Sequence, residues 1–564
     1  MKKRKLTNKA LGDFTMTTRV IPLCFLAIII GVVSTYLAWV LLKLIGVFTN
    51  LFYYGRWGTA LVSPADNHLG LWAILVPVGG GLIVGYMARY GSDRIRGHGI
   101  PEAIESILMN GSRVQPRLSI LKPVSSAVAI GSGGPFGAEG PIIMTGGAVG
   151  SMIAQLFHLT SNERKTLMVA GAAAGMAATF AAPMAAILLA VELLLFEWKP
   201  RSLIPVALAS VTAGAARRYV LGVGPVFPVT LHPIVVGPEI LLGCLLAGLL
   251  AGVLSITVTQ AVYAAEDAFH RLPIHWMWWP AIGGVVVGVG GLIFPPALGV
   301  GYSVIGSFLQ GDATRVAIAG VLLVKSFIWA ASLGSGTSGG VLAPLLMMGS
   351  ALGGLEAMFL PGAGAGFWPL ISMGAMLGGT MRAPLTAILF AAELTHDWNS
   401  LLPLVIATMV SYGFSVLILK RSILTEKIAR RGYHLSAEYE VDPMELLFVH
   451  EVMNPDFSLA DDTLANLEQP GAIVAHPDEP LRAVVYRMAE NGLTRMPVVE
   501  RGNVTSLLGI LTLEDLLRAR TRHLEEDRDR SRVLHIPFLG TRPDPEDRHE
   551  DHDSHEDKVT NTRK

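Results

Sequence analysis

The sequence predicts an all-α polytopic membrane protein, built from two related helical halves and followed by a small α/β domain. Of the 564 residues, 51% are hydrophobic and only 16% are charged, whereas soluble globular chains carry about 25% charged residues. Five apolar stretches are long enough to cross a hydrocarbon layer of ~30 Å as helices, the last with room for a span and a half: Val20–Leu42, Leu167–Val191, Ile240–Ala265, Trp398–Leu419 and Leu272–Gly311.

A basic leader, residues 1–19, precedes the first apolar stretch and includes Lys2, Lys3, Arg4, Lys5, Lys9 and Arg19. Because cytoplasmic segments next to membrane spans are rich in Lys and Arg, we expect this leader to stay in the cytoplasm. The apolar stretch is longer than the apolar region of a signal peptide and no cleavage site follows it. The sequence therefore predicts a multi-pass protein of the cell (inner) membrane with both termini cytoplasmic.

Composition divides the rest of the chain into three parts. The apolar, glycine-rich residues 20–435 form the predicted transmembrane domain, and residues 445–520 show mixed helix and strand patterns typical of a small soluble domain. Residues 525–564 are dominated by charge and are expected to be disordered, because they cannot bury enough apolar surface. The net charge of +0 indicates no nucleic-acid partner, and Cys24 and Cys244, both in apolar runs, predict neither a disulfide framework nor a metal site.

The membrane domain contains an internal repeat. A segment that starts at Leu121 matches one that starts at Val324, and the offset of 203 pairs Lys122 with Lys325, Gly131 with Gly334, Pro141 with Pro344 and Gly146 with Gly349. Further along, an offset of 201 pairs Pro183 with Pro384 and Glu192 with Glu393. Transporters with two such halves, here about residues 70–220 and 275–420, bind substrate at the repeat interface near the bilayer midplane.

Glycine- and proline-bearing segments interrupt the apolar stretches at related places. Broken helices survive in a membrane only inside protein or beside a watery cavity, and a helix that starts there directs free N–H groups and a positive dipole end at its surroundings. Converging N-termini bind an anion through partial charges, weakly enough to release it. Four starts are predicted: Gly97-His98-Gly99-Ile100-Pro101, Gly131-Ser132-Gly133-Gly134-Pro135, Gly137-Ala138-Glu139-Gly140-Pro141 and Gly340-Val341-Leu342-Ala343-Pro344.

Glu139 is the ionisable residue that stands out, because it lies within one of these helix starts. An intramembrane carboxylate indicates function, since burying it is expensive. An anion could compete with the carboxylate for the same N–H groups, and protonation would free the site and couple anion movement to protons. The alternative is a helix-capping carboxylate with no role in transport.

Two other polar positions leave alternatives open. The paired residues Glu192 and Glu393 are interpreted as packing or hydrogen-bonding groups at helix ends, and Glu192 is also a candidate for a proton path. An ordinary histidine titrates near physiological pH. Anion contact, a side chain turned into a cytoplasmic vestibule or a hydrogen bond to the backbone would each explain His98.

These segments resemble the CLC chloride channels and proton/chloride antiporters. GHGIPE from Gly97 is similar to the family's GSGIP segment, GAEGP from Gly137 to GREGP, and GGVLAP from Gly339 to the GxFxP segment, over a likeness that covers about residues 20–518. The resemblance implies two inverted repeats of tilted and re-entrant helices, and a homodimer with one pore per subunit. It also implies that Glu139 gates the pore and that the amides around Glu139, Val341 and Leu342 hold chloride or a related small anion.

Departures from the family pattern concern selectivity and coupling. The family's central serine falls at His98, its arginine before the gating glutamate at Ala138, and its pore tyrosine at Leu424. The second glutamate that relays protons in the antiporters falls at Leu193, which cannot carry a proton, with Glu192 one residue before it. We therefore expect weakly coupled or channel-like transport, with a fully coupled proton/chloride antiporter as the alternative.

The soluble domain resembles a CBS module. Residues 496–499 and 507–511 are its predicted strands, and Gly509, Thr512 and Asp515 form the signature at which family members often hold an adenosine ribose and phosphate. No cofactor is required, and an adenine nucleotide is the candidate ligand. A dimer-contact domain without nucleotide is the alternative. One full copy is evident, and Val449 is interpreted as the start of a reduced first copy.

Parts of the sequence are also compatible with two other functional classes. Gly336-Thr337-Ser338-Gly339 fits the GxSG pattern of an intramembrane serine protease, which needs a histidine to activate the serine, and His396 is a candidate by default. The repeat instead explains Ser338 as part of a helix-start loop. The second of these classes is a sensor without transport. We expect the protein not to be an enzyme.

Overall fold

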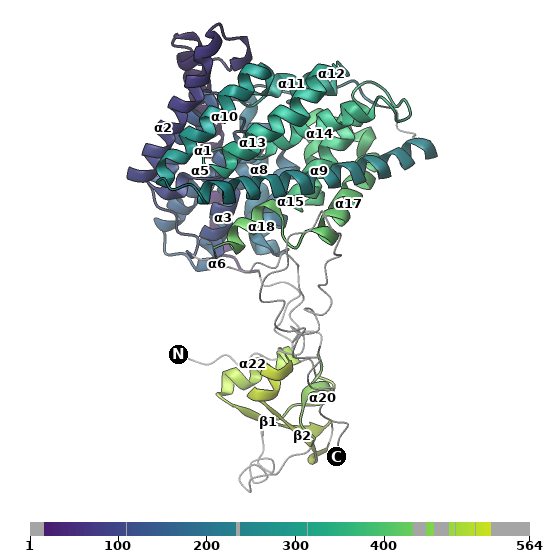
Figure 1. Ribbon diagram of the computed structural model, residues 1–564. Coiled ribbons are helices and arrows are strands. Elements are labelled where there is room, and N and C mark those ends of the chain that lie inside the picture. Colours follow the sequence, from purple (N-terminus) through teal and green to yellow (C-terminus); the bar gives the residue numbers. More distant parts are fainter. Residues whose placement is uncertain are drawn as a thin grey trace, which may run out of the picture. The chain divides into compact units, whose positions relative to one another are not determined.

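The structure is a computed structural model that describes residues 16–108, 110–232, 237–312, 314–431, 447–455, 473–479, 481–501 and 503–519. These residues fall into two compact units, one before and one after the boundary at residues 437 and 438 (Figure 1). Most of the basic leader, the segment between the two predicted domains and the charged tail lie outside the described residues. The two units are described separately below.

The first half of the membrane unit is a bundle of long and short helices. Its elements are α1 (Val20–Tyr54), α2 (Leu75–Tyr90), α3 (Ile100–Leu108), α4 (Leu118–Gly131), α5 (Glu139–Gln155), α6 (Ser161–Phe180), α7 (Pro183–Leu189) and α8 (Pro200–Val220). The predicted span Leu167–Val191 is wrong as one helix. Ala181 adopts the left-handed conformation at φ 57° and the proline at the start of α7 lacks a backbone donor, so α6 and α7 are separate.

The second half repeats this pattern after the long helix α9 (Pro238–His270), which packs against α13, α15 and α17 (Figure 1). Its other elements are α10 (Trp279–Ile293), α11 (Tyr302–Leu309), α12 (Arg315–Ala319), α13 (Ser326–Gly334), α14 (Leu342–Glu356), α15 (Phe367–Met381), α16 (Pro384–Thr395), α17 (Leu401–Ile418) and α18 (Ile423–Ala429). Among the described residues, six helical segments are long and apolar enough to cross a membrane. The all-α membrane fold is confirmed.

Matching contacts relate the two halves. Lys122 is fully buried and donates hydrogen bonds of 2.8 Å to the carbonyls of Ile95 and Gly97. Its counterpart Lys325, also fully buried, donates at 2.9 and 2.7 Å to two carbonyls just before α11. Each lysine satisfies backbone carbonyls that no helix can pair, which explains why a charged side chain is kept in the core of each repeat.

One predicted helix start is wrong. Gly131 is the last residue of α4, and the segment Gly131–Pro135 forms the turn after it instead of opening a helix. Gly133, at φ 98°, continues this turn in a conformation that favours glycine, and the amides of Ser132, Gly133 and Gly134 bond back to carbonyls of α4. The next helix begins only at Glu139.

The C-terminal unit is a small α/β fold. Strands β1 (Arg495–Glu500) and β2 (Asn503–Thr512) form an antiparallel pair, and α20 (Val449–Val452) and α22 (Leu481–Asn491) pack with them around one apolar cluster. Asn454, just after α20, pairs with Ile510 of β2. The interpretation of Val449 as the start of a separate reduced copy is therefore wrong, because that segment completes the same fold.

A buried ion pair joins the loops between helices of the membrane unit. The ring nitrogens of His232 donate to Asp397 Oδ2 at 2.6 Å and to the carbonyl of Ala365 at 3.0 Å, and Ser400 Oγ donates to the same carboxylate at 2.5 Å. Burial acts to lower the pKa of His232, but these two acceptors outweigh it and raise the pKa above its ordinary value. Because both ring nitrogens face acceptors, the imidazole is held as the cation.

This pair makes stability depend on pH. A histidine whose pKa is raised in the folded state stabilises the fold. This stabilisation is complete below the unfolded-state pKa of about 6.5 and is lost as the pH rises through the folded-state pKa. We expect the thermal unfolding midpoint of the purified protein to decrease as the pH is raised from weakly acidic to alkaline. In the His232→Asn variant, the part of this decrease that comes from the ion pair should be absent. An equal fall in the variant would contradict the assignment.

Candidate functional site

Three helix starts predicted from the sequence meet at one place in the membrane unit. Gly137, before α5, and Gly340, before α14, form an antiparallel bridge in which each amide donates to the other's carbonyl, at 3.1 and 2.9 Å. Gly97, before α3, forms a parallel bridge with Ser338. The bridges satisfy some of the backbone groups that a broken helix leaves unpaired, and they hold the starts of α3, α5 and α14 together.

This junction requires glycine because the three backbones approach closely. A Cβ atom on Gly140 would lie 1.7 Å from the carbonyl oxygen of His98, and one on Gly99 would lie 2.4 Å from the carbonyl oxygen of Gly140. Gly99 also has φ 93°, where a side chain is strained. The first-turn amides of α5 and α14 lack helical partners and are the candidate anion donors.

Glu139 is the first residue of α5, and its side chain is fully buried at the junction. One carboxylate oxygen lies so close to Gly137 and Gly340 that Cβ atoms there would sit 1.7 and 2.8 Å from it. Among the described residues, neither carboxylate oxygen has a hydrogen bond of full geometry. The backbone amides of Glu139 itself and of Ala343 nevertheless favour the negatively charged form of the carboxylate. The carboxylate thus occupies the place where an anion would meet the helix starts.

The sequence-predicted residues differ in where they lie. Those brought to the junction are Gly97, His98, Gly99, Ile100, Pro101, Gly137, Ala138, Gly140, Pro141, Gly340, Val341, Leu342, Ala343 and Pro344. Leu424 is fully buried in the first turn of α18, one helical turn before Lys427, whose ammonium contacts Gly97. Since residues i and i+3 share a helix face, Leu424 lies on the side of α18 that faces the junction.

Sequence reasoning missed a buried ion pair beside His98. Glu102 Oε2 accepts a hydrogen bond of 2.8 Å from the amide of Gly99, and its Oε1 lies 2.6 Å from Nζ of Lys427. Glu102 belongs to the GHGIPE segment itself, so a search for acids around the motif would have found it. Lys427 lies 325 residues away in sequence, and nothing in the sequence pairs the two.

Tyr302 was also missed, although the repeat points to it. It opens α11 after Gly299-Val300-Gly301, which matches Gly97-His98-Gly99 at an offset of 202. Its hydroxyl is buried without a hydrogen-bond partner among the described residues, and it interacts electrostatically with Glu139. An extension of the repeat alignment toward the N-terminus of each half would have identified it.

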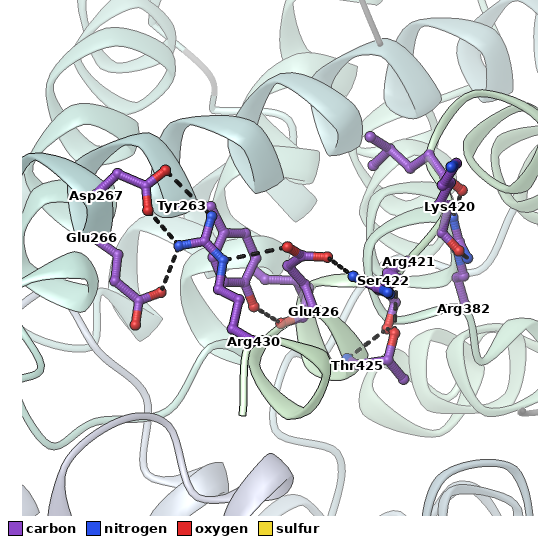
Figure 2. A network of polar contacts seen from close by, with 12 residues as sticks. Tyr263, Glu266, Asp267, Arg382, Lys420, Arg421, Ser422, Thr425, Glu426 and Arg430 are labelled. Carbon is purple, nitrogen blue, oxygen red and sulfur yellow. Dashed lines mark hydrogen bonds and ion pairs between the residues drawn. The ribbon is translucent and has the colours of Figure 1, made fainter. Parts of the chain in front are cut away.

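Helix α18 is fixed to the end of α9 by a polar network (Figure 2). Tyr263 donates its hydroxyl to the carbonyl of Ile423 at 2.5 Å, and the Arg430 guanidinium lies over the Tyr263 ring at 4.6 Å. Arg430 also bonds Asp267 at 2.5 Å and Glu426 at 3.3 Å. The network fixes where α18 presents Lys427 to the junction.

Glu192 and Glu393 cap each other's helices across the repeat. Glu393 accepts from two amides in the first turn of α7, at 3.1 and 2.8 Å. Glu192 accepts from the amides of Leu385 and Thr386 in the first turn of α16, at 3.1 and 2.8 Å. These contacts favour the hydrogen-bonding interpretation. Leu193, at the family's relay position, is buried and apolar.

The remaining candidates have partners of their own. Ser338 Oγ bonds the hydroxyls of Ser126 at 2.8 Å and Ser125 at 3.2 Å, and no histidine is among its partners within the described part of the chain. In the C-terminal unit, the amide and hydroxyl of Thr512 donate to Asp515 at 2.9 and 2.6 Å. Gly509 packs on the Asn454 carbonyl. A nucleotide at this signature would meet side chains that already bond each other.

Comparison with known proteins places these features in a family. The family model described as voltage gated chloride channel matches residues 80–416 of 564, and the CBS domain model matches residues 449–522. A ClcB-like protein of Ralstonia nicotianae is 33% identical over 355 residues, covering 60% of this chain and 82% of the relative. The H(+)/Cl(−) exchange transporter ClcA of Vibrio campbellii is 31% identical over 368 residues, covering 62% and 78%.

Solved structures agree with this assignment at the level of the fold. A slow cyanobacterial Cl−/H+ antiporter superposes with a TM-score of 0.65 at 22% identity, over 74% of this chain and 99% of that one. A CLC-type fluoride/proton antiporter superposes with a TM-score of 0.59 at 20% identity, over 71% and 97%. With its family model matched over more than half of its length, the chain belongs to the CLC family of voltage gated chloride channels.

Proposed function

We propose that this protein carries chloride or a related small anion across a membrane through the junction of α3, α5 and α14, with Glu139 as its gate. One observation supports this most: a fully buried carboxylate lies at the converging helix starts, and within the described residues it has no full hydrogen bond. Partial backbone charges attract an anion without holding it permanently. The carboxylate and the anion would therefore compete for the same amides.

We further propose that coupling to protons is weak or absent. The relay position of the family is Leu193, and both oxygens of the neighbouring Glu192 accept hydrogen bonds at the start of α16. Full proton/chloride exchange is the second candidate, because ClcA relatives carry that name and because Glu102, a buried acid two residues after Ile100, could relay protons near His98. The protein is proposed to work as a homodimer in the cell (inner) membrane with cytoplasmic termini, and its CBS-type unit as a regulatory domain.

The gate is tested by chloride efflux from liposomes that contain only the purified protein. Efflux from the wild type should rise as the pH falls from neutral to acidic, because protonation removes the competing charge. Glu139→Ala should keep a large efflux and lose the dependence on pH. Proton movement recorded in the same liposomes should be small relative to chloride movement. An unchanged pH dependence in the variant would refute the gate, and stoichiometric proton movement would establish the exchanger.

The role of Glu192 is tested against its repeat partner. If both glutamates are helix caps, Glu192→Ala and Glu393→Ala should each cost about 1 kcal/mol of stability, as caps usually do. Both variants should also lower the thermal midpoint by similar amounts and leave the ratio of proton to chloride movement unchanged. A loss of proton movement in Glu192→Ala alone would instead place Glu192 on a proton path.

A further inference from the structure

A gate at Glu139 needs a place for its carboxylate when it leaves the amides of α5 and α14. The side chain is fully buried, and within the described residues neither of its oxygens has a full hydrogen bond. An ionised carboxylate that left the helix starts and met no other donor would be a buried, unpaired charge, which is strongly unfavourable. A nearby donor that is not yet engaged would offset this cost.

Tyr302 carries such a donor. Its phenol oxygen is buried without a hydrogen-bond partner in the described part of the chain, and it interacts electrostatically with Glu139. A phenol can donate one hydrogen bond, whereas an ionised carboxylate can only accept. The unpaired atoms of the two side chains are therefore complementary. They are not bonded to each other while the Glu139 carboxylate lies at the helix starts.

The start of α11 holds Tyr302 next to α14, the helix that supplies part of the candidate anion donors. Gly301 has φ 81°, and a Cβ on it would lie 2.7 Å from Sδ of Met347 in α14. The two carbonyls just before α11 accept hydrogen bonds from Lys325. The ring of Phe227 packs edge-on against that of Tyr302, with centroids 5.9 Å apart. Packing and backbone contacts thus fix the phenol, and its hydroxyl takes no part in them.

The repeat places Tyr302 on the opposite side of Glu139 from His98. The segment Gly299-Val300-Gly301 before α11 matches Gly97-His98-Gly99 before α3 at an offset of 202. Because the two halves of this fold are inverted repeats, the two segments approach the midplane from opposite faces of the membrane. A carboxylate that moves toward Tyr302 therefore moves away from the α3 side of the junction.

Other ionisable groups around the junction are already engaged or lie elsewhere. The buried charged and histidine side chains in or next to the described elements around α5, α11 and α14 are Lys122, Lys325, Glu102, Glu356 and His98. The first four have hydrogen-bond partners of their own, and His98 lies on the α3 side. A pH dependence that requires both Glu139 and the Tyr302 hydroxyl is therefore distinct from the titration of these groups.

We propose that Tyr302 receives the Glu139 carboxylate when the gate leaves the amides, its hydroxyl donating to the ionised acid. Tyr302 is then a positioning residue that lets the gate open with its charge, so that anions pass without protonation of Glu139. A hydrogen bond to an ionised acceptor is about twice as strong as one between neutral groups. The hydroxyl therefore matters most at alkaline pH, where Glu139 is ionised. This role rests on the proposed function of Glu139.

The test is chloride efflux from liposomes that contain the purified full-length protein, measured at one acidic and one alkaline pH. We expect Tyr302→Phe to lower the ratio of alkaline to acidic efflux at least tenfold, a change of about 1.4 kcal/mol, with little effect at acidic pH. In a Glu139→Ala background, the same substitution should change efflux at neither pH. Tyr53→Phe, which removes a buried hydroxyl that donates to the Ser132 carbonyl at 3.0 Å, is the matched control and should leave the ratio unchanged.

Two results would overturn the role of Tyr302 alone. An unchanged ratio in a folded Tyr302→Phe variant would show that the hydroxyl does not meet the gate. Equal losses of efflux at both pH values, repeated in the Glu139→Ala background, would show that Tyr302 contacts the anion or supports the fold. If the efflux of the wild type does not depend on Glu139 at all, the proposed gate fails, and the role of Tyr302 fails with it.

Discussion

Inside a bilayer every backbone N–H and C=O group needs a partner, and this constraint shapes the whole membrane unit. Where α3, α5 and α14 break the helical pattern, their glycine-rich leads bond each other through the bridges Gly97–Ser338 and Gly137–Gly340. The first-turn amides of α5 and α14 have no acceptor within their own helices, and a place for negative charge results from the same breaks. The candidate anion site is thus a consequence of how the backbone groups at the broken helices form their hydrogen bonds.

Charged side chains deep in the unit serve the same constraint. Lys122 and Lys325 donate to carbonyls of the short segments that precede α3 and α11, and Glu192 and Glu393 accept from the starts of α16 and α7. Each pair is related by the repeat: each lysine acts within its own half, and each glutamate caps a helix of the other half. Glu139 differs from them because its carboxylate has no full hydrogen bond among the described residues. A structural acid is held by its donors, whereas a gate must be able to leave them.

Much of the site could be predicted because its determinants are local. Glycines and prolines recur at related places in both halves, and three of the four predicted helix starts, at Gly97, Gly137 and Gly340, followed from them. The fourth was wrong, because Gly131 ends α4. The break at Ala181 was missed because alanine favours helix and only the following Pro183 opposes it. The Glu102–Lys427 pair depends on a contact between residues far apart in sequence, and no local pattern encodes it.

The proposed gate requires that the Glu139 carboxylate and a halide compete for one set of backbone amides. A crystal structure of the Glu139→Gln variant grown in bromide tests it most directly, because the amide mimics the protonated gate and bromide is located by its anomalous signal. We expect a bromide peak beside the amides of α5 and α14, at the place where the carboxylate now lies. A side chain that stays in place, with no bromide at these amides, would contradict the account.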